Sequence, residues 1–260
     1  MQRDSQAVAK LRNYYHRLKR VGRVLRGRDI WTQTEVDCDR VWLGNEGARW
    51  CVDTNGLSSA SVIYSFGVGE DISFERELIR RLGARVHAFD PTPRSICWVR
   101  NQVLPREFLF HEYGIAGFDG SCLFLPPENP SHVSYTISDR PSSQPAVPLT
   151  VHRLTTVMKM LGHDRIDVLK MDVEGAEYDV ISDLMASEVV IKQLLVEFHH
   201  RWPNIGVAKT RQAIRKLSDA GFRIFDVSPT GEEYSFQRCD KPLSSLRFAT
   251  ILQDSPQRGG

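Results

Sequence analysis

The sequence predicts an α/β domain with a doubly wound, mostly parallel sheet, and two features of the chain support this fold class. From residue 61 onward, short apolar segments with strand character alternate with segments of helical periodicity. The last two apolar segments, residues 222–228 and 246–253, are expected to close the chain as an antiparallel pair. Such alternation is typical of parallel strands joined by helices, and the final pair predicts a reversed strand at the carboxyl-terminal end.

Each element is predicted from apolar periodicity and from the Gly and Pro residues that interrupt it. The expected strands are residues 61–66, 85–90, 107–113, 147–151, 166–171 and 189–198. The expected helices are residues 71–83, 93–102, 153–161, 176–185 and 207–220. Gly83 and Gly221 end two of these helices, and Pro93 lies in the first turn of a third.

Residues 1–30 are predicted to form a separate, basic N-terminal helix. Between Lys10 and Arg28 there is no acidic residue, and the basic residues are Lys10, Arg12, Arg17, Lys19, Arg20, Arg23, Arg26 and Arg28. Apolar residues at near-helical spacing are Leu11, Tyr14, Tyr15, Leu18, Val21 and Leu25. One interpretation of residues 10–28 is contact with a membrane surface, an acidic partner or a nucleic acid. The favoured interpretation is that the apolar stripe packs on the domain while the basic face lies in water.

The other boundaries follow from shifts in composition along the chain. Residues 31–60 are aromatic and rich in turns, which predicts an N-terminal hairpin or cap. Residues 61–253 form the main domain, and residues 254–260 are expected to be a flexible tail. Within the main domain, residues 126–148 are rich in Pro and Ser and are predicted to form a loop or lid.

Composition places the chain among ordinary globular proteins, with 260 residues, 41% hydrophobic and 25% charged. The net charge of +2 gives no whole-protein field that favours nucleic acid. The 5 cysteines are scattered and form no CxxC motif, which favours reduced thiols over a disulfide framework or a zinc site. No apolar run approaches the roughly 18 residues of a membrane span, and no signal peptide is evident. A soluble, cytoplasmic protein is therefore expected.

The first strand is followed by a glycine turn made of Gly67, Val68 and Gly69, where the backbone can approach a ligand closely. Ile72 stands where a dinucleotide fingerprint needs its third glycine, so the turn alone is weak evidence. Glu70 and Asp71 would repel a pyrophosphate and attract a cationic ligand that carries an ammonium and a sulfonium. Alternatively, both acids only favour the dipole of the helix that begins there.

The second strand ends at Asp90, which lies 23 residues after Gly67. A carboxylate about 20 residues beyond a glycine turn binds the ribose hydroxyls of a nucleotide in folds of this kind. Pro91 fixes the turn that follows, and Gly114 and Ile115, after the third strand, are candidates for contact with an adenine. The alternative for Asp90 is a surface aspartate that begins a loop.

Two later strands end in acids and imidazoles. Asp172 and Glu174 follow the strand at 166–171, whereas Glu197 and His199 share one side at the end of the strand at 189–198. In a doubly wound sheet these ends are expected to be neighbours. Such a group suits proton abstraction from a hydroxyl, and it also suits a divalent metal ion. His200 faces away and is expected to be structural.

These motifs together resemble the FkbM-type family of class I S-adenosylmethionine-dependent methyltransferases, including its branch similar to methyltransferase-like protein 24. The resemblance covers residues 40–253. It rests on LGNEGARWCVD, YSFGVGEDISFE, HAFDPTP, IDVLKMDVEGAE, LLVEFHHRW, GFRIFDVS and GEEYSFQR, among which IDVLKMDVEGAE is the most specific. The family implies a Rossmann-like sheet with a reversed last strand, the class I methyltransferase fold.

The resemblance also implies S-adenosylmethionine as cofactor and S-adenosylhomocysteine as product. The glycine turn at residues 67–69 would line the methionine part of the cofactor, Asp90 its ribose, and Asp172 would lie beside the reactive methyl. Ser65 departs from the pattern, because many class I enzymes carry an acidic residue on the first strand. It therefore stays open whether Glu70, Asp71 or Glu75 binds the ammonium of the cofactor.

An alcohol needs a base before it can accept a methyl group, and His199 is the candidate, with Glu174 or Glu197 orienting it or acting as the base. No Asn/Asp-Pro-Pro-aromatic turn, typical of enzymes that methylate nucleobase amines, follows the strand at 166–171. We therefore expect an O-methyltransferase that acts on a sugar, a glycoconjugate or a small natural product. A nucleic-acid or protein methyltransferase that uses the basic helix, and a non-catalytic cofactor-binding scaffold, are the alternatives.

Overall fold

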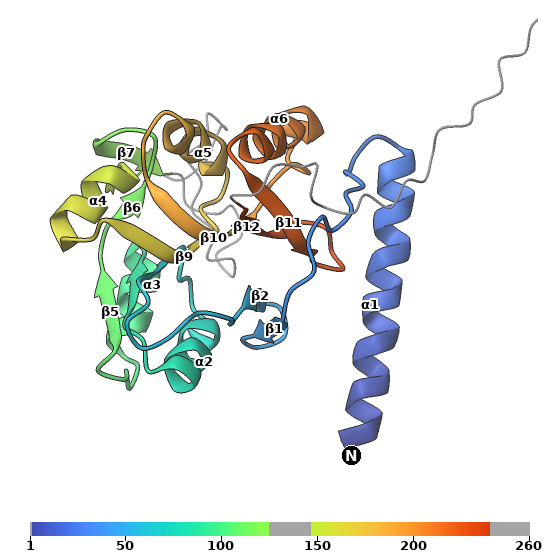
Figure 1. Ribbon diagram of the computed structural model, residues 1–260, viewed down its shortest axis with the longest axis horizontal. Helices are drawn as coiled ribbons and strands as arrows, with labels where there is room; N and C mark the ends of the chain where they lie inside the picture. Colours follow the sequence, from blue (N-terminus) through green and yellow to red (C-terminus); the bar gives the residue numbers. More distant parts are fainter. Residues whose placement is uncertain (1, 125–146, 240–260) are drawn as a thin grey trace, which may run out of the picture.

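A computed structural model describes residues 2–124 and 147–239 of the chain (Figure 1). Its centre is a seven-stranded sheet with the order β11-β12-β10-β9-β3-β4-β5. The strands are β3 (Ile63–Phe66), β4 (Val86–Phe89), β5 (Phe108–His111), β9 (Arg165–Met171), β10 (Val190–Glu197), β11 (Phe222–Val227) and β12 (Glu233–Arg238). All neighbouring pairs are parallel except the two made by β12, so the expected mostly parallel sheet with a reversed strand is confirmed.

Among the described residues, the reversed strand is β12, a segment for which the sequence predicted no strand. Residues 222–228 were expected to pair with 246–253, but β11 pairs with β12, which lies between β10 and β11. Tyr234, Ser235 and Phe236 of β12 are buried, so this short segment supplies the core contacts of a sheet strand. Residues 246–253 lie outside the described part of the chain.

Helices cover both faces of the sheet and divide the core into two layers. On one face, α4 (Leu154–Leu161), α5 (Glu177–Met185) and α6 (Gly206–Asp219) pack against β3, β9, β10 and β12. On the other face, α2 (Ser73–Leu82) and α3 (Pro93–Arg100) pack together with a small hairpin. Successive side chains of one strand alternate between the two cores, as Val168 and Leu169 of β9 do.

The hairpin expected within residues 31–60 consists of β1 (Arg40–Leu43) and β2 (Trp50–Asp53), which pair antiparallel. The expected strand at 147–151 is β8 (Val147–His152), but it joins a separate three-stranded sheet with β6 (Gly114–Ile115) and β7 (Gly120–Phe124). Apart from residues 147 and 148, the Pro- and Ser-rich segment predicted as a loop or lid lies outside the described residues. The predicted tail at 254–260 does so as well.

The N-terminal helix α1 (Gln2–Leu25) runs along one side of the domain (Figure 1). The favoured prediction, that its apolar stripe packs on the domain, is wrong. The stripe residues are between 40% exposed at Val21 and 83% exposed at Leu25, and the side that faces the domain carries Arg20 instead. Within the described residues, no helix has the length and apolar character needed to cross a membrane.

Candidate active site

Strand register brings the candidate residues to one edge of the sheet. Phe89, Phe66, Met171 and Val196 lie side by side in β4, β3, β9 and β10. The next residue in each strand or turn is therefore Asp90, Gly67, Asp172 or Glu197, at the carboxyl ends of parallel strands where α/β sheets bind ligands. A cavity of about 320 Å³ opens at this edge, lined among others by the glycine turn, Lys170, Asp172 and Glu197.

The glycine turn packs directly on the acidic turn after β9. Gly67 has φ +82°, and a Cβ atom there would lie 1.7 Å from the carbonyl oxygen of Asp172. Only glycine allows both this backbone conformation and this approach. Lys170 donates a hydrogen bond to the carbonyl oxygen of Gly67 and lies 3.9 Å from the Asp172 carboxylate. The glycine turn after β3 and the acidic turn after β9 therefore pack together as one unit.

Asp90 fixes the glycine turn from the other side. Its Oδ2 accepts hydrogen bonds from the backbone N–H groups of Val68 (3.1 Å) and Gly69 (2.9 Å). Its Oδ1 accepts from the N–H group (2.9 Å) and the hydroxyl (2.6 Å) of Thr92. These bonds use all four acceptor positions of the buried carboxylate, so contact with a ribose hydroxyl requires Asp90 to exchange one of them.

The expected adenine region lies next to this turn. Gly114 and Ile115 are both buried in β6. A Cβ atom at Gly114 would come 3.1 Å from Cγ of Pro91, so the two segments pack closely. Pro91 and Gly114, which are distant in the sequence, therefore lie together beside the end of β4.

The acids that follow the glycine turn have structural partners. Arg94 donates two hydrogen bonds to Glu70, at 2.9 and 2.8 Å. Asp71 accepts a hydrogen bond of 2.7 Å from the N–H group of Ser73 and so caps the start of α2, the alternative role considered for this residue. It also accepts from the side-chain amide of Asn45 and remains in the wall of the cavity.

Glu75 brings a carboxylate to the end of β3, next to Ser65. The Ser65 hydroxyl donates a 2.6 Å hydrogen bond to Oε1 of Glu75, which reaches the end of β3 from α2. Oε2 of Glu75 is buried, makes no hydrogen bond within the described residues, and belongs to a side chain that lines the cavity. Burial raises the pKa of Glu75, although Lys170 and Ser65 oppose this. A carboxylate with one oxygen left without a hydrogen bond suits a cationic ligand group.

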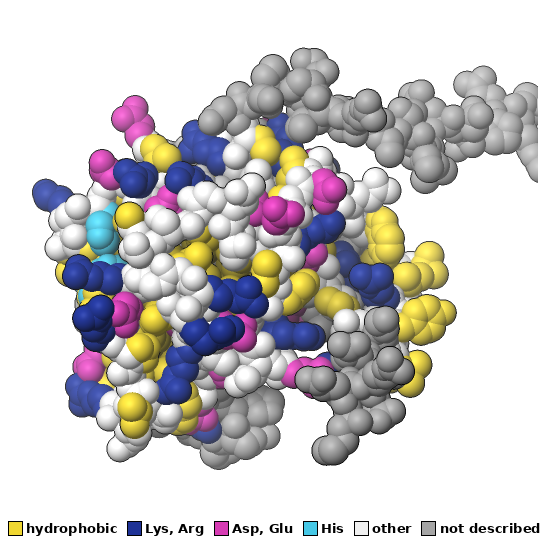
Figure 2. Space-filling view, turned by 60° about the horizontal axis from the view of Figure 1, so that its bottom comes forward, with side chains coloured by type: hydrophobic (Ala, Val, Ile, Leu, Met, Phe, Trp, Pro, Cys, Tyr) yellow, Lys and Arg dark blue, Asp and Glu magenta, His cyan; other side chains and the backbone are white. Residues whose placement is uncertain are grey.

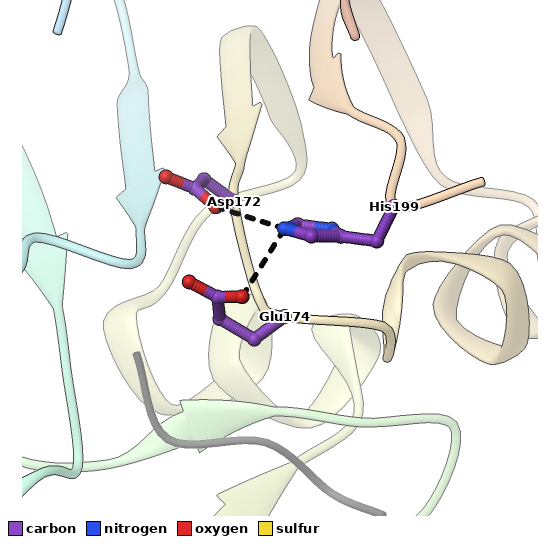
Figure 3. A group of neighbouring side chains, drawn as sticks. All are labelled: Asp172, Glu174 and His199. Carbon is purple, nitrogen blue, oxygen red and sulfur yellow. Dashed lines mark ion pairs between the residues drawn. The ribbon is translucent and has the colours of Figure 1, made fainter. Parts of the chain in front are cut away.

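The acids and the imidazole after β9 and β10 come together as predicted (Figure 3). Nε2 of His199 lies 3.2 Å from Oε2 of Glu174 and 3.9 Å from Oδ1 of Asp172. Glu174 has φ +53°, a left-handed conformation that costs about 1–3 kcal/mol in a residue other than glycine. Together with Gly175 at φ +101°, it reverses the chain and brings its carboxylate back to His199.

Glu177 belongs to this group and was missed at the sequence level. Its Oε1 lies 2.9 Å from Nδ1 of His199, and its carboxylate also accepts hydrogen bonds from the N–H groups of Val173 and Gly175. Glu177 is fully buried. It ends the motif IDVLKMDVEGAE, and that position was the only sequence signal available for it, because an acid at a helix start is ordinary.

The charges of this group shift several pKa values. Burial alone would lower the pKa of His199, but the charges and hydrogen bonds of Glu177 and Glu174 outweigh it and raise this pKa well above 6.5. Burial raises the pKa of Asp172 to about 6, with Glu174 adding to the effect and Lys170 opposing it. The pKa of Glu197 is raised well above 4.5 by burial and then by the charges of Asp172 and Glu233. The site thus holds more carboxylates than its own cations can balance.

A metal ion is compatible with the same residues. Asp172, Glu174 and His199 each offer one ligand atom, and these atoms lie within 4.8 Å of one another. Two carboxylates and an imidazole suit several divalent ions. The metal requirement stays a prediction. His200, expected to be structural, is buried and lies 3.2 Å from Asp29, away from this group.

The sheet order, the reversed strand and the cavity at the carboxyl edge are those of a class I methyltransferase domain, a class whose enzymes use S-adenosylmethionine. A family model described as Methyltransferase FkbM domain matches residues 64–224. The chain belongs to this family, as the resemblance of its motifs implied.

Two curated relatives are both described as Probable methyltransferase-like protein 24. The Homo sapiens protein is 27% identical over 195 residues, which cover 71% of this chain and 45% of the relative. The Rattus norvegicus protein is 28% identical over 173 residues, which cover 63% and 42%. The chain therefore spans less than half the length of these relatives.

Two solved structures are similar to part of this chain at low sequence identity. Methyltransferase FkbM from Methylobacillus flagellatus KT is 13% identical with a TM-score of 0.43, over 70% of this chain and 44% of that one. Aeropyrum pernix fibrillarin, in complex with natively bound S-adenosyl-L-methionine, is 12% identical with a TM-score of 0.35, over 70% and 66% of the two chains.

Proposed function

We propose that this chain transfers the methyl group of S-adenosylmethionine to a hydroxyl group of a sugar, a glycoconjugate or a small natural product. The observation that carries the proposal is the pairing of His199 with Glu174 and Glu177, next to Asp172, which lines the same cavity as the glycine turn. This arrangement offers a group that can take a proton next to the position expected for the reactive methyl.

In this proposal, residues at the ends of β3 and β4 would hold the cofactor. The turn of residues 67–69 lines its methionine part, and Glu75 binds the ammonium through the carboxylate oxygen that has no other partner. Asp90 exchanges a backbone contact for a ribose hydroxyl, while Pro91, Gly114 and Ile115 lie beside the adenine. Replacing Asp90 with Ala should therefore weaken cofactor binding, and an unchanged dissociation constant would contradict the ribose assignment.

The transfer breaks the bond between the sulfonium and its methyl and forms a bond between the methyl and the acceptor oxygen. The acceptor loses its proton to the base, and the cofactor leaves as a neutral thioether. Positioning of the oxygen behind the methyl supplies much of the rate. The base is His199 in its neutral form, held by Glu177 at Nδ1, so that Nε2 can take the proton.

Cofactor binding itself helps to prepare this base. Without the cofactor, the charges of Glu177 and Glu174 raise the pKa of His199 and so favour its protonated form. A positive sulfonium nearby disfavours the imidazolium and lowers the pKa of His199 toward the working pH. Asp172, with a pKa of about 6, and Glu197 then ionise more readily, because the new cation balances their charge.

The test begins with calorimetric titration of the protein with S-adenosylmethionine, S-adenosylhomocysteine and, as a control, NAD. The protein is then incubated with S-adenosylmethionine and a panel of glycosides and hydroxylated small molecules. Mass spectrometry and NMR of the product should show an O-methyl group together with S-adenosylhomocysteine. Methylation of an amine, of a protein or of a nucleic acid would contradict the acceptor class. Cofactor binding without any methylated acceptor would favour the scaffold alternative.

A further inference from the structure

We propose that α1 is an interfacial anchor that binds this domain to an anionic membrane surface. One face of the helix carries the apolar stripe Leu11, Tyr14, Tyr15, Leu18, Val21 and Leu25, and every one of these side chains is exposed. A group of hydrophobic side chains projects from the right edge of Figure 2, where α1 lies in Figure 1. Nothing among the described residues covers this stripe.

The basic residues of α1 flank the stripe on both sides. With 3.6 residues per helical turn, Arg17 lies at one edge of the stripe, and Lys19 and Arg26 lie at the other. These three side chains are exposed, and the segment from Lys10 to Arg28 contains no acidic residue. Long basic side chains beside an apolar face can reach the headgroups while that face enters the acyl boundary, the arrangement of helices that lie in a membrane interface.

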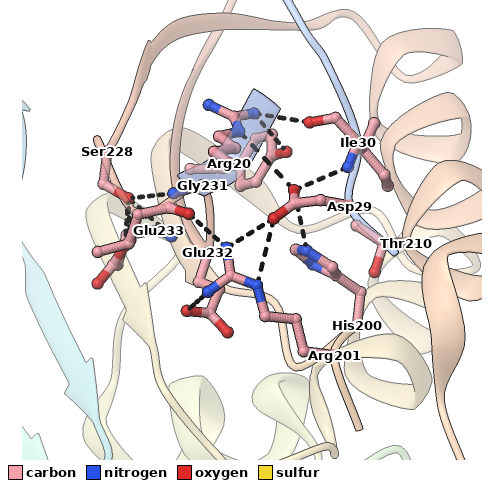
Figure 4. A network of polar contacts seen from close by, with 12 residues as sticks. Arg20, Asp29, Ile30, His200, Arg201, Thr210, Ser228, Gly231, Glu232 and Glu233 are labelled. Atoms are coloured by element: carbon pink, nitrogen blue, oxygen red, sulfur yellow. Dashed lines mark hydrogen bonds and ion pairs between the residues drawn. The ribbon is translucent and has the colours of Figure 1, made fainter. Parts of the chain in front are cut away.

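The opposite side of α1 is fixed to the domain, so the exposed stripe is presented in a defined orientation. The buried Arg20 donates a hydrogen bond of 2.8 Å to the carbonyl oxygen of Ile30 and lies 3.7 Å from Asp29 (Figure 4). Gly231 passes so close that a Cβ atom there would meet Nε of Arg20 at 2.4 Å. Because the buried Arg20 occupies the face of α1 that contacts the domain, the apolar stripe on the opposite face is exposed.

Charge decides which occupant fits the stripe. A second copy of α1 would place one basic set against another at short range, which costs free energy. A nucleic acid would pair with the basic residues but would leave the apolar side chains without a function, since phosphate contacts provide the affinity. An anionic lipid surface satisfies both, because each basic side chain near it contributes about 1 kcal/mol and the stripe is buried as well.

The experiment is flotation of the full chain with vesicles of phosphatidylcholine alone and of phosphatidylcholine mixed with phosphatidylserine. We expect binding to the anionic vesicles only, weakening as salt is raised because the charges are exposed. Replacing both Leu18 and Leu25 with Asp should reduce the partition by at least about tenfold. The matched control is Val103→Asp, which changes an apolar residue that is 90% exposed on another surface and should leave binding unchanged.

Three outcomes would overturn the proposal. Equal partition of the Leu18→Asp, Leu25→Asp protein and the parent would show that the stripe does not enter the bilayer. A dimer in sedimentation that these substitutions dissociate, without vesicle binding, would make the stripe a contact between copies. Binding to single-stranded RNA in the absence of vesicle binding would assign the basic residues to nucleic acid. Because none of these assays measures methyl transfer, they stand apart from the proposed activity.

Discussion

His199 and His200 are neighbours in the chain, yet the groups around them differ in charge balance (Figures 3 and 4). His199 is paired with Glu174 and Glu177, with Asp172 also near its Nε2. His200 instead pairs with Asp29, a carboxylate that also binds the guanidinium of Arg201 at 2.6 Å. The first cluster has more acids than cations, whereas the second contains its own balance of charge.

The pKa values express the same difference. Burial opposes ionisation of Asp29, but hydrogen bonds from His200, Arg201 and the N–H group of Ile30 outweigh it and lower its pKa. In the other cluster the pKa values of Asp172 and Glu197 are raised. A cluster that lowers its carboxylate pKa values needs no further partner. A cluster that raises them is stabilised when a cation binds, and the proposed cofactor carries positive charge.

The strongest test of the comparison is removal of each histidine. His199→Ala should lower kcat by about 10²–10⁴-fold, because the proton acceptor is lost, while the affinity for S-adenosylmethionine changes much less. His200→Ala should keep kcat near that of the parent and lower the thermal midpoint. Steady-state kinetics, calorimetry and thermal unfolding of the two variants provide the measurement. Equal losses of kcat would mean that the two clusters are not functionally distinct.

The second test concerns the stability that the balanced cluster provides. Asp29→Ala leaves Arg20, His200 and Arg201 without their shared carboxylate, and the free energy of unfolding should fall by about 3–5 kcal/mol. Asp119 is a matched control, because it also lies near a histidine, 3.3 Å from His152, but is exposed. Denaturant unfolding of Asp119→Ala should show a loss of about 1 kcal/mol or less. Similar losses for both variants would contradict the role given to burial.

The third test addresses the excess of acid around the cavity. Glu75→Gln removes the charge of the carboxylate whose Oε2 makes no hydrogen bond among the described residues, and the affinity for S-adenosylmethionine should fall by about tenfold to a hundredfold. Glu70→Gln is the control, because Arg94 already pairs with this acid beside the same turn. Calorimetry should show a much smaller change for Glu70→Gln. A larger effect there would assign the cofactor ammonium to Glu70 instead.

Sequence patterns predicted the site as far as it depends on strand ends. Parallel strands in register must bring their carboxyl ends to one edge, so Asp172, Glu174 and His199 could be placed together in advance. Glu177 could not, because its contact with His199 depends on the left-handed turn at Glu174, which no periodicity reveals. Asp29 was equally hidden, since a linker residue that meets Arg201 from far along the chain leaves no local pattern.

Periodicity also identifies an apolar face without showing what covers it. The stripe of α1 was recognised from its spacing, but its exposure follows from Arg20, whose buried contacts turn the other side of the helix inward. Similarly, the longer apolar run at 246–253 was preferred over the short β12 as the reversed strand. A segment becomes a buried strand when it lies between two other strands of the sheet. That placement depends on the tertiary structure and is not visible in the local sequence.

The smallest expected effect is the most specific, because it tests how the unbalanced cluster sets the proton affinity of His199. Glu177→Gln removes the charge beside Nδ1 and keeps the shape of the side chain, so the pKa of His199 should fall toward 6.5. If neutral His199 is the base, the rising limb of the kcat–pH profile should then move to lower pH. Asp179→Asn removes the same charge from an exposed position in the first turn of the same helix and should leave the limb in place.

Stability should respond to the same substitution with a defined sign. A histidine whose folded pKa is raised stabilises the fold fully below its unfolded pKa of about 6.5, and this contribution is lost as pH rises through the folded pKa. The difference in unfolding free energy between the parent and Glu177→Gln should therefore be largest near or below that value and shrink at higher pH. Glu177 would be a positioning residue only if Glu177→Gln changes both the kcat–pH profile and the pH dependence of the unfolding free energy. A lower kcat with an unmoved pH profile would make it an ordinary part of the core, and the distinction between the two histidines would then depend on Glu174 alone.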